Sequence, residues 1–147
     1  MRLAAVTLAA VLAASAAVAQ EETFVRKDSP HDVETTVERI AETVEQGGGK
    51  VFARLDHAEA AAEYDLEMAP TTVIVFGNPK VGTPMMQENP TLALDLPLKV
   101  LVREGENGVE VVYREPATWL GDHGMESAAE GMAGMLDKIT DRAVAAE

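Results

Sequence analysis

The chain has 147 residues, no cysteine, and 25 Asp and Glu against 12 Lys and Arg, for a formal net charge of −13. The absence of cysteine excludes disulfides, cysteine nucleophiles and thiolate metal ligands. The negative charge repels phosphate backbones and anionic lipid headgroups, which argues against nucleic-acid binding. The length is enough for one domain with one core and too short for two.

The first 19 residues have the three parts of a secretory signal peptide. Arg2 precedes an apolar run that closes on Ala17-Val18-Ala19, an Ala-x-Ala cleavage pattern. The run is mainly Ala, Ser and Thr, and it is slightly shorter than the roughly 20 residues that span a bilayer. We therefore predict cleavage after Ala19, a single domain over residues 20–147, a periplasmic or secreted location, and no stable membrane anchor.

The predicted domain begins with a strand and a long amphipathic helix. Glu22–Lys27 is expected to be the strand, and Ser29 followed by Pro30 predicts a helix start with Ser29 as the N-cap. Three glycines at residues 47–49 end the helix. Its apolar positions recur at helical spacing on one face: Val33, Val37, Ile40, Ala41 and Val44.

The middle of the chain alternates between short strands and short helices. Lys50–Asp56 alternates as a strand, and the alanine-rich His57–Tyr64 follows it as a helical turn. Thr71–Phe76 is apolar on both faces, which is typical of a central strand. A helix beginning at Pro84 and a strand at Leu94–Pro97 are expected to follow.

A hairpin is predicted around Asn107-Gly108, between the strands Leu98–Arg103 and Val109–Arg114. If these two residues form the whole loop, Val102 faces Tyr113. One face of the hairpin is then apolar through Leu98, Val100, Val109 and Val111. The opposite face holds the charged side chains of Lys99, Arg103, Glu110 and Arg114.

After a turn around Pro116–Gly121, a last helix is predicted over about Met125–Ala145. The side chains expected to be buried on it are Met125, Ala128, Met132, Met135, Leu136 and Ile139. The element order is β-α-β-β-β-β-α, and strands joined by short turns favour antiparallel pairing. The sequence therefore predicts an α+β fold with an antiparallel sheet of four to five strands and two main helices on one face.

Three stretches carry a family likeness: LDHAEAA at Leu55–Ala61, VIVFGNPKVGTPMM at Val73–Met86, and LALDLPLKVLV at Leu92–Val102. They resemble DUF302, a bacterial and archaeal family of unknown function, and the likeness covers about half of the domain. The resemblance implies a TATA-binding-protein-like α+β fold with the order β-α-β(4)-α. It also implies a homodimer, and it implies no enzymatic activity.

Asp56, His57 and Asp95 are the candidate catalytic residues. A carboxylate beside an imidazole can orient a general base, so Asp56-His57 is a possible pair. The favoured structural alternative is that Asp56 caps the following turn and His57 donates to a backbone carbonyl. Asp95 is expected either to be buried and hydrogen-bonded or to form one wall of a pocket with His57.

Asn78, Lys80, Met85 and Met86 are the candidate ligand-binding residues. Lys80 follows the Gly77-Asn78-Pro79 turn and can hold an anion near a helix start, although a solvated lysine is the favoured alternative. The methionines suggest copper, because thioethers suit Cu(I). Core packing explains those of the last helix more simply, so neither a metal site nor a cofactor is predicted.

The leading hypothesis is an exported, non-enzymatic module that binds a small molecule or a periplasmic protein through its sheet or through a pocket near His57, Lys80 and Asp95. The first alternative is a small acid–base enzyme that uses His57 with Asp56 or Asp95. A copper or zinc carrier is the weaker alternative.

Overall fold

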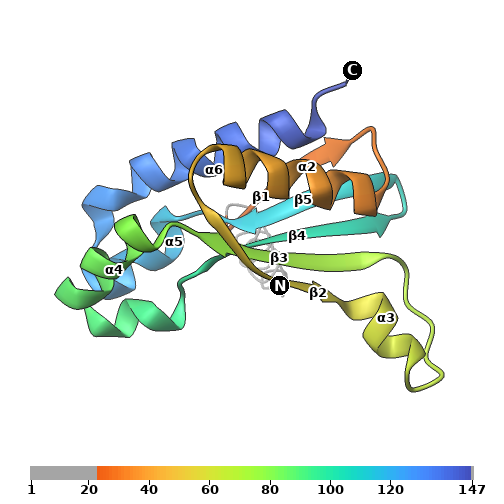
Figure 1. The fold of residues 1–147 in the computed structure, drawn as a ribbon, viewed down its shortest axis with the longest axis horizontal. Helices are drawn as coiled ribbons and strands as arrows, with labels where there is room; N and C mark the ends of the chain where they lie inside the picture. Colours follow the sequence, from red (N-terminus) through yellow and green to blue (C-terminus); the bar gives the residue numbers. More distant parts are fainter. Residues whose placement is uncertain (1–22, 147) are drawn as a thin grey trace, which may run out of the picture.

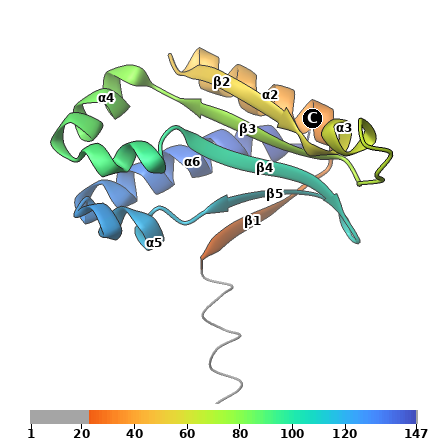
Figure 2. The same cartoon turned by 90° about the horizontal axis from the view of Figure 1, so that it is seen from below.

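A computed structural model describes residues 23–146 and shows one antiparallel sheet with two long helices on one of its faces (Figures 1 and 2). The strands lie in the order β1-β5-β4-β3-β2. Their bounds are β1 Phe24–Ser29, β2 Lys50–Asp56, β3 Thr71–Gly77, β4 Leu98–Gly105 and β5 Gly108–Arg114. The predicted fold class is confirmed. The predicted signal peptide lies outside the described residues, within which no helix is long and apolar enough to cross a membrane.

Helix α2, Val33–Gln46, lies on the sheet through the apolar face that its sequence predicts. All five expected apolar side chains are buried. The predicted cap is wrong, because Asp32 caps the helix by accepting the Thr35 N–H at 2.7 Å. Ser29 instead ends β1, where its hydroxyl shares a 2.7 Å hydrogen bond with the hydroxyl of Thr36.

Helix α6, Ala129–Val144, lies beside α2 on the same face of the sheet (Figure 1). The expected start at Met125 is wrong, because short turns of helix precede α6: α5 Ala117–Leu120, η2 Gly121–His123 and η3 Glu126–Ala128. Leu136 and Ile139 are buried as expected, but Met135 is 42% exposed. Met135 therefore lies at the margin of the apolar stripe rather than in its centre.

The strand pairing confirms one expectation and corrects another. Strand β3 is an interior strand, paired with β4 on one side and with the edge strand β2 on the other. In the hairpin Val102 pairs with Val111, two positions away from the expected partner Tyr113. The expected turn needs positive φ at both loop residues, yet only Gly108 has it, at 116°. Because the register differs by an even number, every side chain keeps the predicted face.

The connection from β3 to β4 differs most from expectation. Asn78 accepts the Lys80 N–H at 3.0 Å and caps helix α4, Pro79–Glu88, so Pro84 lies inside the helix rather than at its start. A 3₁₀ helix, η1 Pro90–Leu94, follows, and the expected strand at Leu94–Pro97 is absent. Helix α4 lies beyond the end of β3, at the opposite end of the sheet from the short helix α3, His57–Ala62 (Figure 1).

A cluster of charges fixes α6 to the edge of the sheet. The ammonium of Lys27 on β1 lies 2.9 Å from Asp137 and 2.6 Å from Asp141, both on α6. The Tyr113 hydroxyl of β5 donates to Asp137 at 2.6 Å. This hydroxyl, and then Lys27, hold the pKa of Asp137 below its usual value. Asp137 therefore joins the helix to two neighbouring strands.

Replacing Asp137 with Asn is expected to lower the free energy of unfolding by about 1 kcal/mol at pH 7, because the ion pair with Lys27 is lost. The folded-state pKa of Asp137 is lowered, so its contribution exists above the unfolded-state pKa and is lost as pH falls through the folded-state pKa. Urea unfolding should therefore separate the variant from the parent at pH 7, and the difference should be smaller near pH 3, below the usual Asp pKa of about 3.9. An equal difference at both pH values would contradict this account, and Asp122→Asn, at an exposed carboxylate, is the control.

Candidate functional site

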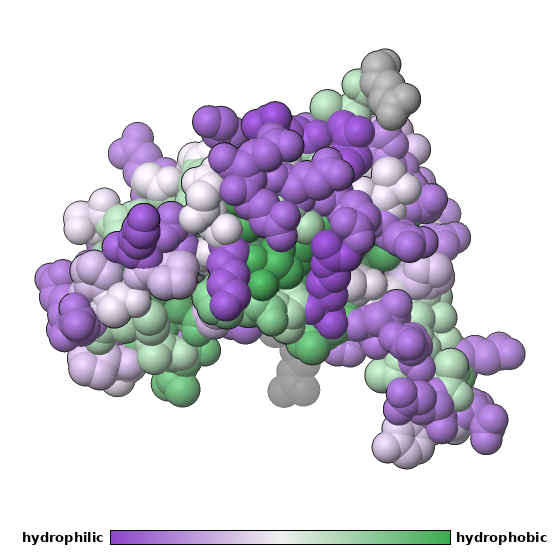
Figure 3. Space-filling model, viewed as in Figure 1, coloured by the Kyte–Doolittle hydropathy of each residue, from purple (hydrophilic) through white to green (hydrophobic). Residues whose placement is uncertain are grey.

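A groove of about 470 Å³ opens where the C-terminal end of α2 meets α4 and α6. The end of β3 contributes Phe76 and Gly77 to it, and the start of β2 contributes Phe52. We call it the α4–α6 groove. Its volume lies within the range of roughly 300–1,000 Å³ that is usual for small-molecule sites. In Figure 3 an apolar patch lies near the centre of the face shown, with hydrophilic side chains on both sides.

The walls of the groove are mainly apolar, and methionines from two helices are prominent in them. Met85 and Met86 come from α4, and Met132 and Met135 come from α6. Gly82 lies among them on α4: a Cβ atom there would stand 3.7 Å from Leu96 and 3.9 Å from Met86. Methionine side chains are flexible and polarisable, so this wall can adapt to apolar groups of different shape.

The charged side chains that line the groove are both cationic. Lys138 and Arg142 lie four residues apart on α6, which places them on the same side of that helix. The Arg142 guanidinium donates to Gln46 at 3.4 Å, and Lys138 has neither an ion pair nor a hydrogen bond to another described residue. No carboxylate from the described part of the chain lines the groove. This is notable in a protein with so many acidic residues.

Three of the four predicted ligand-binding residues line this groove, namely Asn78, Met85 and Met86. Lys80 does not line the groove, and it is exposed at another position on α4. Lys138 and Arg142 were not predicted from the sequence, since charged residues on an amphipathic helix ordinarily face solvent. The sequence signal that could have identified them is their spacing of four residues, close to Met135 on the same helix.

His57, Lys80 and Asp95 do not converge on one pocket. The strand register places Asp56 level with Thr72 and Val102, whereas the residues after Asp95 enter β4 at Leu98, opposite Phe76. Asp56 and His57 therefore lie at one end of the sheet and Asp95 at the other. The expected pairing of His57 with Asp95 is wrong, and the groove is lined by neither of them.

Asp56 and His57 have ordinary structural surroundings. The Asp56 carboxylate accepts the Glu59 N–H at 2.9 Å and caps α3, as the structural alternative predicts. His57 is exposed, and it makes no side-chain hydrogen bond to any of residues 23–146, so the expected bond to a backbone carbonyl is absent.

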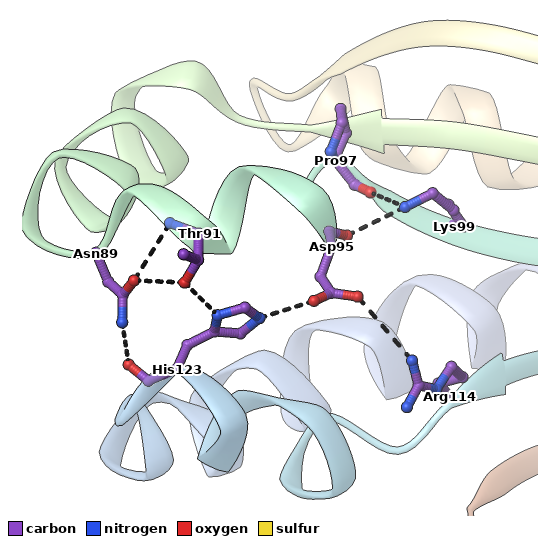
Figure 4. Close-up of polar contacts among 7 residues, drawn as sticks. All are labelled: Asn89, Thr91, Asp95, Pro97, Lys99, Arg114 and His123. Carbon is purple, nitrogen blue, oxygen red and sulfur yellow. Dashed lines mark hydrogen bonds and ion pairs between the residues drawn. The ribbon is translucent and has the colours of Figure 1, made fainter.

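Asp95 instead pairs with His123, a contact that the sequence pattern does not predict. The Asp95 carboxylate lies 2.7 Å from His123 Nε2 and 4.0 Å from the Arg114 guanidinium (Figure 4). On the other side of the ring, the Thr91 hydroxyl lies 2.9 Å from His123 Nδ1. The His123 side chain is only 8% exposed.

A hydroxyl, an imidazole and a carboxylate in this order also occur in nucleophilic enzymes. Here Thr91 lies 2.7 Å from the Asn89 side-chain oxygen as well, and Asn89 both caps η1 and donates to the backbone oxygen of His123. These bonds join η1 to η2, and none of the bonded residues lines the groove. We therefore assign this cluster, which we call the η1–η2 clip, a structural role.

The described residues contain no group of three His, Asp or Glu side chains that could hold a metal ion. The four methionines of the groove are the remaining soft donors, and thioethers suit Cu(I). The two cations beside them repel a metal ion, however. The charges of the groove therefore favour an anionic or neutral ligand over copper or zinc.

Comparison with known proteins identifies the fold and its relatives. The profile of the family described as Domain of unknown function DUF302 matches residues 25–143. The crystal structure of an uncharacterized conserved DUF302 protein from Bacillus stearothermophilus is similar with a TM-score of 0.74 at 21% identity, over 82% of this chain and 98% of that one. The family resemblance read from the sequence is confirmed.

Relatives with more similar sequences are larger proteins. The Fluoride-specific ion channel FluC 1 of Brucella suis biovar 1 is 42% identical over 98 residues, which is 66% of this chain and 38% of the relative. The Fluoride-specific ion channel FluC 2 of Brucella melitensis biotype 1 is also 42% identical, with 36% of its length matched. The chain spans little more than a third of the length of these relatives.

The two histidines His123 and His57 are expected to respond differently to replacement by alanine. His123→Ala should lower the free energy of unfolding by about 1–2 kcal/mol, because it removes the bonds to Thr91 and Asp95 and leaves a partly buried carboxylate with a weaker partner. His57→Ala, at an exposed position, should change it by less than about 0.5 kcal/mol. Chemical denaturation of both variants measures these effects, and a larger loss for His57→Ala would contradict the structural role given to the clip.

Proposed function

We propose that this chain, which belongs to the DUF302 family, binds a small apolar ligand in the α4–α6 groove. The observation that carries the proposal is the groove itself: a hollow of about 470 Å³ whose walls are mainly apolar and come from three helices and three strands. Such a cavity with a few polar groups at its margin is the usual form of a ligand site.

The exposure of large apolar side chains around the groove supports the proposal. Met135 is 42% exposed and Val81 is 58% exposed, and both contribute to the lining. Apolar surface that stays in contact with water costs free energy, and contiguous patches of it usually mark binding sites. A ligand that covers these side chains removes that cost.

The lining also favours binding over catalysis. Among the described residues it contains neither a histidine nor a carboxylate, the groups that most often act as a general base near neutral pH. The clip around His123 and the exposed His57 lie outside the groove. We therefore prefer a binding module to the acid–base enzyme that the sequence left open as an alternative.

The proposal predicts that wild-type protein binds N-phenyl-1-naphthylamine, a neutral apolar dye whose fluorescence rises in apolar surroundings. Gly82→Leu should weaken binding at least about tenfold, because the new side chain points toward Leu96 and Met86 and fills the groove.

Gly131→Leu is the matched control for this variant. It makes the same exchange within a helix, at a glycine of α6 whose Cβ direction has no atom within 4 Å. Its dye affinity should stay within about twofold of the wild-type value. Equal affinity in both variants, or no dye binding by the wild-type protein, would refute the groove as the site.

A second candidate function is a role beside a membrane channel. It is favoured by the 42% identity to two proteins named as fluoride-specific ion channels, which contain a segment like this chain within a longer polypeptide. The signal-peptide pattern of residues 1–19 supports an exported position for such a partner. Export and the homodimer implied by the family likeness stay predictions.

This second role predicts that the tagged chain co-purifies with a fluoride channel expressed in the same cells, after mild detergent extraction of the membranes. An unrelated channel of similar size, expressed to the same level, is the control. Equal recovery of both channels, or of neither, would exclude the channel as a stable partner.

A further inference from the structure

We propose that the ligand of the α4–α6 groove is an amphiphile with one anionic head group, namely a free long-chain carboxylate. This inference rests on the proposed ligand-binding function and adds the chemical class of the ligand. The apolar walls would hold the chain, and Lys138 and Arg142 would hold the carboxylate.

The two cations are arranged so that one anion can reach both. They lie four residues apart on α6, so their side chains project from the same side of the helix. Within the described part of the chain, the Arg142 guanidinium makes one long hydrogen bond, to Gln46 at 3.4 Å, and Arg39 contacts only the backbone oxygen of Arg142. A guanidinium has five N–H donors, so most remain available for a carboxylate.

Lys138 also has donors available, although its own helix carries Asp137 and Asp141. Asp137 and Asp141 both pair with Lys27 of β1. Lys138 has no ion pair with any described residue, and it lies in the groove instead. The charge cluster that fixes α6 to the sheet therefore also turns the acidic side chains of the helix away from the groove.

The net charge of −13 opposes an anionic ligand at long range. At physiological ionic strength, however, charges are screened over about 8 Å. A carboxylate in the groove is therefore affected mainly by Lys138 and Arg142, whereas a bilayer of anionic lipids meets the whole acidic surface. The charges thus favour a single dissolved amphiphile over a membrane surface.

The experiment compares three ligands that share a twelve-carbon chain and differ in head charge: dodecanoate, dodecanol and dodecyltrimethylammonium. Each competes with N-phenyl-1-naphthylamine below its micelle concentration. Wild-type protein should bind dodecanoate roughly tenfold or more tightly than the other two. Lys138→Gln and Arg142→Gln should each weaken dodecanoate roughly three- to tenfold and leave dodecanol unchanged. Lys138→Arg, which keeps the charge, should restore binding.

Lys80→Gln is the matched control, because it removes a cation from α4 outside the groove. Its affinity for dodecanoate should equal that of the wild-type protein. Two results would overturn the carboxylate proposal: equal affinity for dodecanoate and dodecanol, or an equal loss of dodecanoate affinity in Lys80→Gln and Lys138→Gln. If the wild-type protein still binds the dye in that case, the apolar site stands. Preference for the trimethylammonium ligand would also overturn the carboxylate proposal. A protein that binds no dye and none of the three ligands would refute the proposed function itself.

Discussion

Within residues 23–146, the long helices cover only one face of the sheet, and this constraint determines where the groove lies. Ile74, Val100 and Val111 are completely buried on that face, and α2 and α6 must lie side by side to cover them. Two helices cover the middle of the sheet but not the end of β3. The chain places α4 there, and the three helices meet without closing the space between them. The groove is therefore a consequence of how the core is covered.

The same constraint explains the position of the charges. Because the apolar stripe of α6 faces the sheet, its polar residues divide between its two flanks. One flank faces β1, where Asp137 and Asp141 find Lys27. The other flank faces α4 and carries Lys138 and Arg142. One helix thus contributes an ion-pair cluster to the fold and, to the candidate site, two cations that have no ion pair among residues 23–146.

The sequence predicted those features that depend on local periodicity. The apolar face of α2, the capping of α3 by Asp56, and the inward face of the hairpin all follow from spacing within one element. The register of the hairpin could not be predicted from this spacing, because the register depends on which turn residue adopts positive φ. The helix start at Pro79 was missed because Pro84 offered a second possible start further along the chain.

The candidate site was predictable only in part, for a related reason. Asn78, Met85 and Met86 belong to one continuous segment, so a local pattern could identify them. The contribution of α6 depends on a contact between segments about 50 residues apart in the sequence, which no single-sequence pattern encodes. The pair of Asp95 with His123 was missed in the same way, since 28 residues separate them. Contacts between short polar loops leave no periodic pattern in the sequence from which they could be predicted.

Helix α4 contributes no fully buried side chain, although it forms one wall of the groove. Met85 and Met86 are partly buried against the core, so replacing them costs some stability, whereas Val81 is 58% exposed and can change at little cost. Substitutions at the exposed positions of this wall therefore cost less stability than substitutions in the core. The proposed site can thus change its ligand at these positions while the sheet and its two covering helices stay the same.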